Sequence, residues 1–435
     1  MSGPHRKVPS ARLSRLAAFG QMAGGVAGGV LAEGARRLVR GERPQLPDLL
    51  LTPGNVGRVT EQLSRLRGAA MKLGQMISLD AGDMLPPELT AILAKLRDSA
   101  HHMPPRQLQQ VLAAEWGADW RSRFAHFEAT PVAAASIGQV HRARLPDGRV
   151  VAVKVQYPGV AASIDADVDN VATLLRLSGL LPASLDIAPL LTEAKAQLKE
   201  EADYRREAAQ MRRYAELLKD DARFVVPRPV EDRSTQRVLV MDFIEGRSIE
   251  TLADAPQDRR DAAMTAMLDL VLHELFVFGY MQTDPNFANY RWQPDSGRIV
   301  LLDFGAARPV PVDTTQGYRG LLRAGLAGDR AALRTALVEV GFVSPALLAN
   351  HGERLDAMID VILDHVLRPG LFDFADRAFV GRLRELAMPV AKDRSLWHLP
   401  PVETLFVQRK VSGTALLAVR MRARVPLIDM VRTMA

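Results

Sequence analysis

Apolar and polar residues follow one another along the chain in three successive patterns: helical, then strand-like, then helical again. Between residues 59 and 77, apolar side chains recur at steps of three and four, which predicts an amphipathic helix. The proline pair at 86–87 ends this unit and starts a second helix at 87–98, and a further helix follows the pair at 104–105. We therefore expect a helical segment before the first strand.

Strand-like runs come next. A short run at 124–128 precedes two longer ones at 138–145 and 149–156, which are separated by Pro-Asp-Gly at 146–148. Because these three residue types favour tight turns, the two longer runs predict a β-hairpin.

Longer segments follow the hairpin. Two helices are predicted at about 159–179 and 186–219, and another strand at 237–241. From Pro256 onward the pattern is mainly helical, with a loop-and-strand interruption at 284–303. The expected fold class is α+β, with a mixed small lobe followed by a helical large lobe.

Composition divides the chain into four expected regions. They are a basic Gly/Ala-rich N-terminal segment with a linker, a helical extension, a small lobe and a large lobe. These regions span residues 1–58, 59–118, 119–243 and 244–435, respectively.

The chemistry is narrowed by composition and charge. The chain has no cysteine, which excludes disulfides, thiolate metal sites and cysteine nucleophiles, and its nine histidines show no metal-ligand spacing. The formal net charge is +6, and residues 1–45 carry eight Lys or Arg against two acids. Such a surface attracts nucleic acid or anionic lipid. Because no basic run is interleaved with aromatic residues, we expect a lipid membrane as the partner and no nucleic acid.

Residues 16–32 are apolar but consist largely of Ala and Gly. Gly20 and Gly24 have the small-residue spacing that suits close helix packing, which would permit a homodimer. About 17 residues is the lower limit for a membrane span, and Ala and Gly gain little transfer energy. Three interpretations stay open: a flexible or interfacial N-terminus, a membrane-associated helix, and an organelle transit peptide.

Two aspartates dominate the candidate chemistry. Asp284 is followed five residues later by Asn289, and Asp303 opens Asp-Phe-Gly after the apolar run 299–302. In protein kinases a loop Asp faces the reacting oxygen, an Asn five residues later helps to hold Mg²⁺, and the Asp of Asp-Phe-Gly holds metal between phosphates. Asp-Phe-Gly alone is a weak signal, but the strand, the triplet and the Asp-to-Asn step together predict an Mg²⁺–nucleotide site.

Lys154 is the only charged residue in the apolar run 150–155. A buried ammonium group needs an anionic partner. The acid-rich stretch after residue 200 offers one, because Asp203 and Glu207 are four residues apart and share a helix face. Two simpler interpretations stay open: a water-facing lysine on an edge strand, and a solvated charged helix.

The glycine-rich phosphate loop of kinases is replaced here by small residues with side chains. They are Ala133, Ala134, Ala135 and Ser136. Because alanine restricts the backbone where glycine does not, this loop should be stiffer, although a plain turn before a strand is the alternative. Lys72 and Gln75 lie three residues apart and share a helix face, where a surface polar pair is the simpler interpretation.

Together these motifs resemble those of the UbiB-like (AarF-type) atypical kinases, in the branch linked to ubiquinone biosynthesis. The KxGQ sequence at 72–75 and the Ala-rich loop at 133–140 are specific to that family and absent from ordinary protein kinases. The matching motifs occur in the family order across residues 60–310, and the sequence at 283–289 is similar to the mitochondrial and proteobacterial branch.

The resemblance implies a bilobal protein-kinase-like fold that binds ATP and Mg²⁺. Lys154, paired with Glu207, would contact the α- and β-phosphates. Asn289 and Asp303 would hold Mg²⁺, and Asp284 would be the loop aspartate near the γ-phosphate.

A regulatory cover is also implied by the resemblance. Lys72 and Gln75 would fold over the active site and meet Glu201 and Asp203, with Lys72 close to the chemistry. This cover would fill the groove where protein kinases bind peptide. Phosphorylation of other proteins is therefore not expected, and ATP hydrolysis or transfer to a small membrane-associated molecule is favoured.

The implied protein is an atypical kinase or ATPase that supports ubiquinone (coenzyme Q) biosynthesis at a membrane surface. Met241 and Ile244 would bound the hinge beside the adenine, and the Ala-rich loop would bias nucleotide choice. The partners would be an anionic membrane and quinone-biosynthesis proteins or intermediates. The protein would be cytoplasmic and peripheral to the inner membrane, or on the matrix side in a mitochondrion.

Two alternatives belong to other classes. One is a non-catalytic scaffold of a biosynthetic complex, switched by nucleotide. The other is a small-molecule phosphotransferase of the antibiotic- or choline-kinase type, which shares the Asp-to-Asn spacing but lacks the KxGQ helix.

Overall fold

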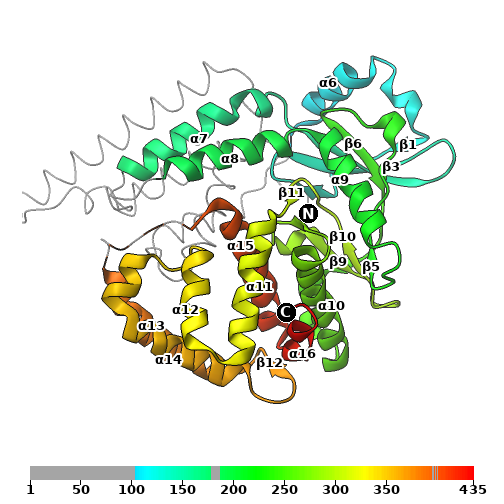
Figure 1. Ribbon diagram of the computed structural model, residues 1–435. Coiled ribbons are helices and arrows are strands. Elements are labelled where there is room, and N and C mark those ends of the chain that lie inside the picture. Colours follow the sequence, from blue (N-terminus) through cyan, green and yellow to red (C-terminus); the bar gives the residue numbers. More distant parts are fainter. Residues whose placement is uncertain (1–102, 178–186, 394–395, 397, 399) are drawn as a thin grey trace, which may run out of the picture. The chain divides into compact units, whose positions relative to one another are not determined.

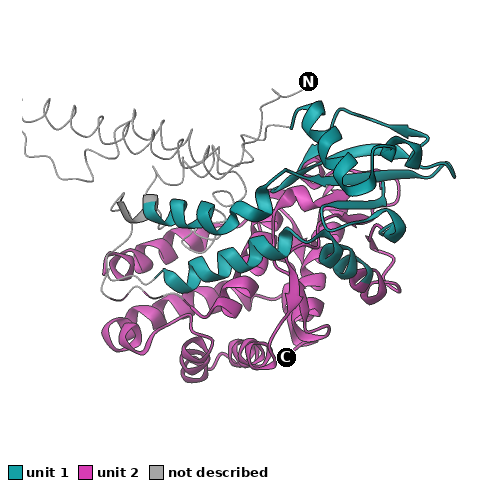
Figure 2. Cartoon of the chain, turned by 90° about the horizontal axis from the view of Figure 1, so that it is seen from above, with its two compact units in different colours: residues 1–212, 228–243 teal, residues 213–227, 244–435 magenta. Residues whose placement is uncertain are grey.

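The computed structural model describes residues 103–177, 187–393, 396, 398 and 400–435 (Figure 1). The segment 16–32 and the helices expected at 59–77 and 87–98 lie outside these residues. The chain forms two compact units, coloured separately in Figure 2. Unit 1 comprises residues 1–212 and 228–243, and unit 2 comprises residues 213–227 and 244–435.

Unit 1 is built on a five-stranded sheet in which every pairing is antiparallel. Its strands are β1 (His126–Phe127), β2 (Ala133–Ala134), β3 (Gly138–Arg144), β4 (Val150–Gln156) and β6 (Val238–Asp242). The path runs β1-β3-β4-β6, and β2 pairs with β3. β4 lies between two neighbours, and all its residues after Val150 are buried. It is therefore the core strand of this sheet.

The β3–β4 hairpin predicted from the sequence is confirmed. Gly148 has φ +89°, a region that glycine adopts without the steric penalty of a Cβ atom. Its N–H donates to the carbonyl of Leu145 at 3.0 Å, and Asp147 Oδ1 accepts from the N–H of Arg149 at 3.0 Å. Local turn chemistry thus helps to set the register of the hairpin.

The helices of unit 1 correct one expectation. They are α6 (Pro105–Trp116), α7 (Val160–Leu177), α8 (Ala188–Glu201) and the first part of α9 (Tyr204–Leu217). The single helix expected at 186–219 is wrong, because α8 and α9 are separate. The Asp203 side chain accepts from the N–H groups of Arg205 and Arg206, at 3.0 and 3.4 Å, and thereby caps a new helix.

Unit 2 contains short strands, which form one four-stranded sheet and two two-stranded sheets. β5 (Phe224–Val225), β10 (Ile299–Leu301), β9 (Tyr290–Trp292) and β7 (Arg247–Ser248) form one sheet in that order, with only β5 and β10 parallel. Two further pairs are antiparallel: β8 (Tyr280–Gln282) with β11 (Ala307–Pro309), and β12 (Phe372–Asp373) with β13 (Arg424–Val425). The expected α+β class is confirmed by this mixture of sheets and helices.

Helices make up most of unit 2. They are α10 (Gln257–Phe276), α11 (Val312–Ala327), α12 (Arg330–Glu339), α13 (Pro345–Val366), α14 (Ala378–Lys392), α15 (Val402–Met421) and α16 (Leu427–Arg432). α10 and α15 pack side by side (Figure 1). Both helices bury residues along most of their length. Among the described helices, none has the length and apolar character needed to cross a bilayer.

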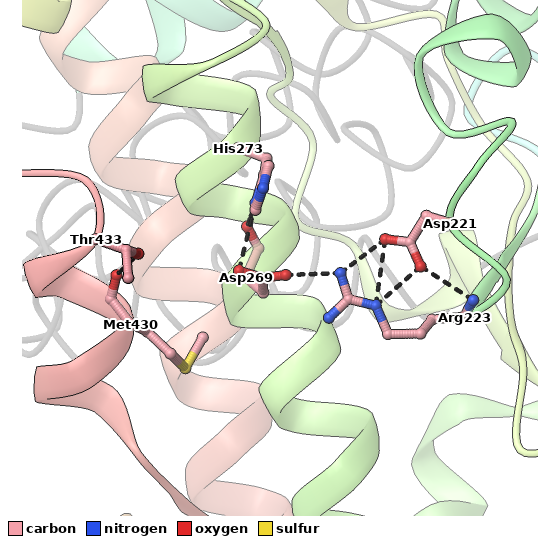
Figure 3. Close-up of polar contacts among 6 residues, drawn as sticks. All are labelled: Asp221, Arg223, Asp269, His273, Met430 and Thr433. Atoms are coloured by element: carbon pink, nitrogen blue, oxygen red, sulfur yellow. Dashed lines mark hydrogen bonds and ion pairs between the residues drawn. The ribbon is translucent and has the colours of Figure 1, made fainter.

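An ion-pair network ties the segment 213–227 to α10 (Figure 3). Arg223 Nη2 lies 2.7 Å from Asp221 Oδ2 and 2.6 Å from Asp269 Oδ2. The side-chain hydrogen bonds from Arg223 hold the pKa of Asp221 below its usual value. This guanidinium therefore joins the segment that carries β5 to the helix that crosses unit 2.

We expect Arg223→Gln to lower the free energy of unfolding at neutral pH by about 1 kcal/mol, because partly exposed ion pairs contribute little. A depressed carboxyl pKa stabilises the fold above the unfolded pKa, about 4, and the contribution is lost as the pH falls through the lower folded pKa. Urea unfolding should therefore show a difference between parent and variant that is constant from about pH 8 to 5 and shrinks below about 4. A difference that stays the same at about pH 3 would contradict this linkage.

Candidate functional site

Lys154 lies in the middle of β4, opposite Val140 on β3 and Leu239 on β6. The residue is 6% exposed, so it is not a water-facing lysine on an edge strand. Its Nζ donates to both carboxylate oxygens of Glu207, at 2.7 and 2.9 Å. The ring of Tyr204 has its centroid 5.1 Å from the same nitrogen. A buried carboxylate and an aromatic face thus hold the ammonium group in one orientation.

The Ala-rich loop is the tight connection between β2 and β3. Ala133 and Ala134 form β2, and the N–H of Ala135 donates to the carbonyl of Gly138 at 2.9 Å. Ser136 Oγ donates to Oε2 of Glu201, at the end of α8, at 3.2 Å. The loop is therefore fixed both by its own backbone and by a carboxylate from a helix.

Gly138 occupies a place where no side chain fits. A Cβ atom here would lie 2.5 Å from the carbonyl oxygen of Val155 and 2.7 Å from Oη of Tyr204. This residue was not among those expected from the sequence. The available signal was a glycine at the start of a strand, which often marks a close backbone approach.

Glu201 and Asp203 do not share the role of Glu207. Glu201 binds the Ala-rich loop, whereas Asp203 caps α9. Lys72 and Gln75 lie outside the described residues, so their expected contact with these two acids stays a prediction.

Met241 and Ile244 lie where the chain passes from unit 1 to unit 2. Met241 is a buried residue of β6 that pairs with Ala152 of β4, and the boundary between the units falls between Phe243 and Ile244. Their expected contact with adenine stays a prediction.

Asp284 and Asn289 lie in the loop between β8 and β9, which we call loop 283–289. Thr283 Oγ1 donates to the carbonyl of Ala306 at 2.9 Å, and this bond ties the start of the loop to the segment after Asp-Phe-Gly. The N–H of Asn286 donates to Oδ1 of Asp284 at 3.3 Å. Side chain and backbone thus fold the loop onto itself.

The structure brings Asn289 and Asp303 together. The N–H of Leu302 donates to the carbonyl of Asn289 at 3.0 Å, and both predicted ligands line the same small pocket. The N–H of Gly305 donates to Oδ1 of Asp303 at 2.9 Å and fixes that carboxylate. Nδ2 of Asn289 is buried and has no hydrogen-bond partner among the described residues.

These two residues fit Mg²⁺. An amide oxygen and a carboxylate oxygen are hard ligands, and Mg²⁺ is usually held by one or two protein groups together with phosphates. Within the described part of the chain, no hydrogen bond through Nδ2 holds the Asn289 amide. Within the residues that the structure describes, no group of three or more His, Cys, Asp or Glu could hold a metal ion. Because Mg²⁺ is six-coordinate, two protein oxygen donors leave positions for phosphate oxygens and water, and the donor set suits an ion shared with a phosphate ligand.

α15 contacts the loop through Gly413. A Cβ atom at this position would lie 2.2 Å from Cβ of Pro285. Glycine inside a helix lowers helix stability by up to about 1 kcal/mol relative to alanine. The close approach of the loop explains why a glycine stands there.

A buried ion pair borders the same pocket. Lys410 Nζ on α15 lies 3.3 Å from Oε2 of Glu274 on α10, and both side chains are 1% exposed. The sequence of residues 311–435 predicts helices but contains no recognisable motif. A signal for this pair was present in the sequence: Lys410 stands among apolar residues at the helical spacing that predicts a buried face.

Comparison with known proteins agrees with these motifs. Residues 95–337 match the model of the ABC1 atypical kinase-like domain. The chain is 39% identical over 427 residues to the Saccharomyces cerevisiae protein named atypical kinase COQ8, mitochondrial, covering 96% of this chain and 83% of the yeast protein. It is 38% identical over 431 residues to the Rattus norvegicus atypical kinase COQ8B, mitochondrial, covering 98% of this chain and 80% of the rat protein.

A solved structure has a similar fold. It is the complex of Rv3197 with erythromycin from Mycobacterium tuberculosis, which is 26% identical and has a TM-score of 0.59. The alignment covers 87% of this chain and 95% of that protein. The similarities together show a kinase-like α+β fold.

We expect Gly413→Ala to lower the free energy of unfolding by about 1–3 kcal/mol, because overpacking against Pro285 outweighs the better helix propensity of alanine. Gly320→Ala is the matched control, since Gly320 lies in α11 and its added Cβ would have no neighbour within 4 Å. The control should leave stability unchanged or slightly raised in urea unfolding. Equal effects of the two substitutions would contradict the packing explanation.

Proposed function

Because the chain belongs to the ABC1 atypical kinase-like family, the UbiB-like kinases, we propose that it is an Mg²⁺–ATP-binding kinase or ATPase that supports ubiquinone biosynthesis at a membrane surface. The observation that carries the proposal is the meeting of Asn289 and Asp303 in one pocket, with Asp284 in the same loop as Asn289. Phosphoryl transfer in kinase-like folds uses oxygen ligands that hold the metal ion and an aspartate that orients the attacking group.

The nucleotide would be bound mainly by unit 1 residues. Lys154 would contact the α- and β-phosphates, and its bidentate bond to Glu207 supports this because it holds the ammonium group in one orientation. Met241 and Ile244 would bound the adenine site. Residues 133–136 would follow the phosphates less closely than a glycine-rich loop does, since their side chains limit backbone approach.

Residues of unit 2 would hold the metal ion at the reacting phosphate and orient the attacking group. Asn289 and Asp303 would hold Mg²⁺, which supplies neutralisation of phosphate charge when bound. The hydrogen bond from Gly305 keeps the Asp303 carboxylate in place, so little reorganisation is needed on binding. Asp284 would orient the attacking hydroxyl or water and accept its proton.

The acceptor would be water or a small membrane-associated molecule. Lys72 and Gln75, meeting Glu201 and Asp203, would cover the groove that protein kinases use for peptide, so transfer to proteins is not part of the proposal. The basic segment 1–45 would bind anionic lipid. The names of the yeast and rat relatives support a mitochondrial location. Within a mitochondrion we propose the matrix side of the inner membrane, and in a bacterium the cytoplasmic side.

A nucleotide-switched scaffold is the second candidate function. It is favoured by the bond from Ser136 to Glu201, because this bond links the nucleotide loop directly to α8. Such a protein would bind Mg²⁺–nucleotide without turnover, also in the presence of lipid. A soluble-metabolite phosphotransferase has less support, since that class lacks a KxGQ helix. Binding to partner proteins of quinone biosynthesis, and homodimerisation, fit either function.

We expect Asp303→Asn to abolish Mg²⁺-dependent binding of ATP and its turnover, because the substitution removes the one anionic ligand in the proposed metal pair. Calorimetry and phosphate release measure the two effects. Asp313→Asn, an exposed position in the first turn of α11, is the control and should behave like the parent. A variant that hydrolyses ATP at the parent rate would refute the metal assignment.

We expect anionic liposomes to raise ATP turnover relative to neutral liposomes, since the proposed acceptor and the basic segment both belong to a membrane surface. Phosphate release from the parent and from Lys72→Ala, measured with each liposome type, tests this. Loss of the lipid response in Lys72→Ala would support the role of the KxGQ cover. No response in the parent would argue against a membrane-surface function.

A further inference from the structure

A buried polar cluster joins α15 to the two strands that flank loop 283–289. Lys410 Nζ lies 3.1 Å from Oη of Tyr290, 3.3 Å from Oε1 of Gln282 and 3.3 Å from Oε2 of Glu274. Gln282 is the last residue of β8 and Tyr290 is the first residue of β9, so they stand on either side of the loop. One ammonium group therefore bridges both ends of the loop.

Glu274 holds this ammonium group from the side of α10. Its Oε1 accepts from Oη of Tyr214 at 2.8 Å and from the N–H of Gln282 at 3.3 Å. Burial lowers the pKa of Lys410, but the attraction of Glu274 and the bonds to Tyr290 and Glu274 outweigh it, so the pKa lies above its usual value. Burial raises the pKa of Glu274 against the opposing effect of Lys410. Lys410 therefore carries its positive charge in the folded protein.

Stability alone does not account for this pair. Replacing a buried ion pair by apolar residues of similar volume is often neutral or stabilising. Lys410 and Glu274 line the pocket that Asn289 and Asp303 also line. One turn further along α15, Gly413 packs against Pro285 inside the loop. α15 thus contacts the loop both at its base and near Asp284.

We propose that Lys410 is a positioning residue, which fixes the separation of the two ends of loop 283–289 and so sets where Asp284 and Asn289 stand relative to Asp303. The chemical consequence rests on the proposed function, whereas the restraint on the loop concerns this fold alone. Without the ammonium group, Gln282 and Tyr290 lose their common donor and the loop gains freedom. The metal contact of Asn289 is then weakened, while Lys154 and the other nucleotide contacts of unit 1 are unchanged.

The test compares the parent with Lys410→Met, Lys410→Arg and the double variant Glu274→Gln/Lys410→Met. The double variant leaves no unpaired buried charge, so it should fold even where Lys410→Met does not. Lys219→Met is the control, because it removes an ammonium group whose side chain is 58% exposed. Thermal unfolding checks the fold. Calorimetry measures ADP affinity with and without Mg²⁺, and amide hydrogen exchange across residues 283–289 is measured without nucleotide.

For the double variant we expect faster exchange in loop 283–289. We also expect the gain in ADP affinity on adding Mg²⁺ to fall by about 10- to 100-fold, the usual effect of losing a group that orients a metal ligand. Metal-free ADP affinity should not change. Lys410→Arg keeps the charge and should restore part of the gain, and Lys219→Met should match the parent. A merely structural role would lower the melting temperature without changing the effect of Mg²⁺.

The inference is overturned by a folded double variant with parent-like loop exchange and a parent-like response to Mg²⁺. If the parent protein binds no Mg²⁺–ADP, the effect of Mg²⁺ cannot be compared, and loop exchange alone tests the restraint. If the double variant then still shows faster loop exchange, the proposed function fails while the restraint by Lys410 is supported.

Discussion

Two buried ammonium groups constrain how the elements pack in the part of the chain that the structure describes. Lys154 in unit 1 and Lys410 in unit 2 are both withdrawn from water, and each faces a buried carboxylate. Removing such a charge from water costs several kcal/mol, and an unpaired charge would not be tolerated. Glu207 must therefore lie against β4, and Glu274 must lie against α15. In each unit the need to pair one charge fixes a helix against its neighbour.

Close backbone approach is the second constraint, and it acts beside the same two lysines. Gly138 lets the start of β3 approach Val155 and Tyr204, next to the strand that carries Lys154. Gly413 lets α15 approach Pro285, one turn beyond Lys410. At both places a single added carbon would push on an element that carries a proposed functional residue. Packing and electrostatics are thus joined at the candidate site.

Loop 283–289 shows how a short segment obtains its shape from distant parts of the chain. Thr283 is bonded to Ala306, Asn289 to Leu302, and the residues on both sides of the loop to Lys410. These partners lie after the loop in sequence, and the last of them follows it by more than a hundred residues. The placement of Asp284 and Asn289 therefore depends on distant parts of unit 2 as well as on bonds within the loop.

Turn residues, side-chain periodicity and motif spacing are local signals, and they were enough to predict the hairpin of β3 and β4, the strands β1, β6 and β10, and the family. The sequence showed that a charge in an apolar strand needs an acidic partner, and the family resemblance implied that this partner is Glu207. The sequence did not predict the break at Asp203, where a side-chain cap overrides helical periodicity. Only the tertiary structure identified Gly138, Gly413, Glu274 and Lys410. Their importance comes from atoms that lie close in space and far apart along the chain, and no local pattern records such distances.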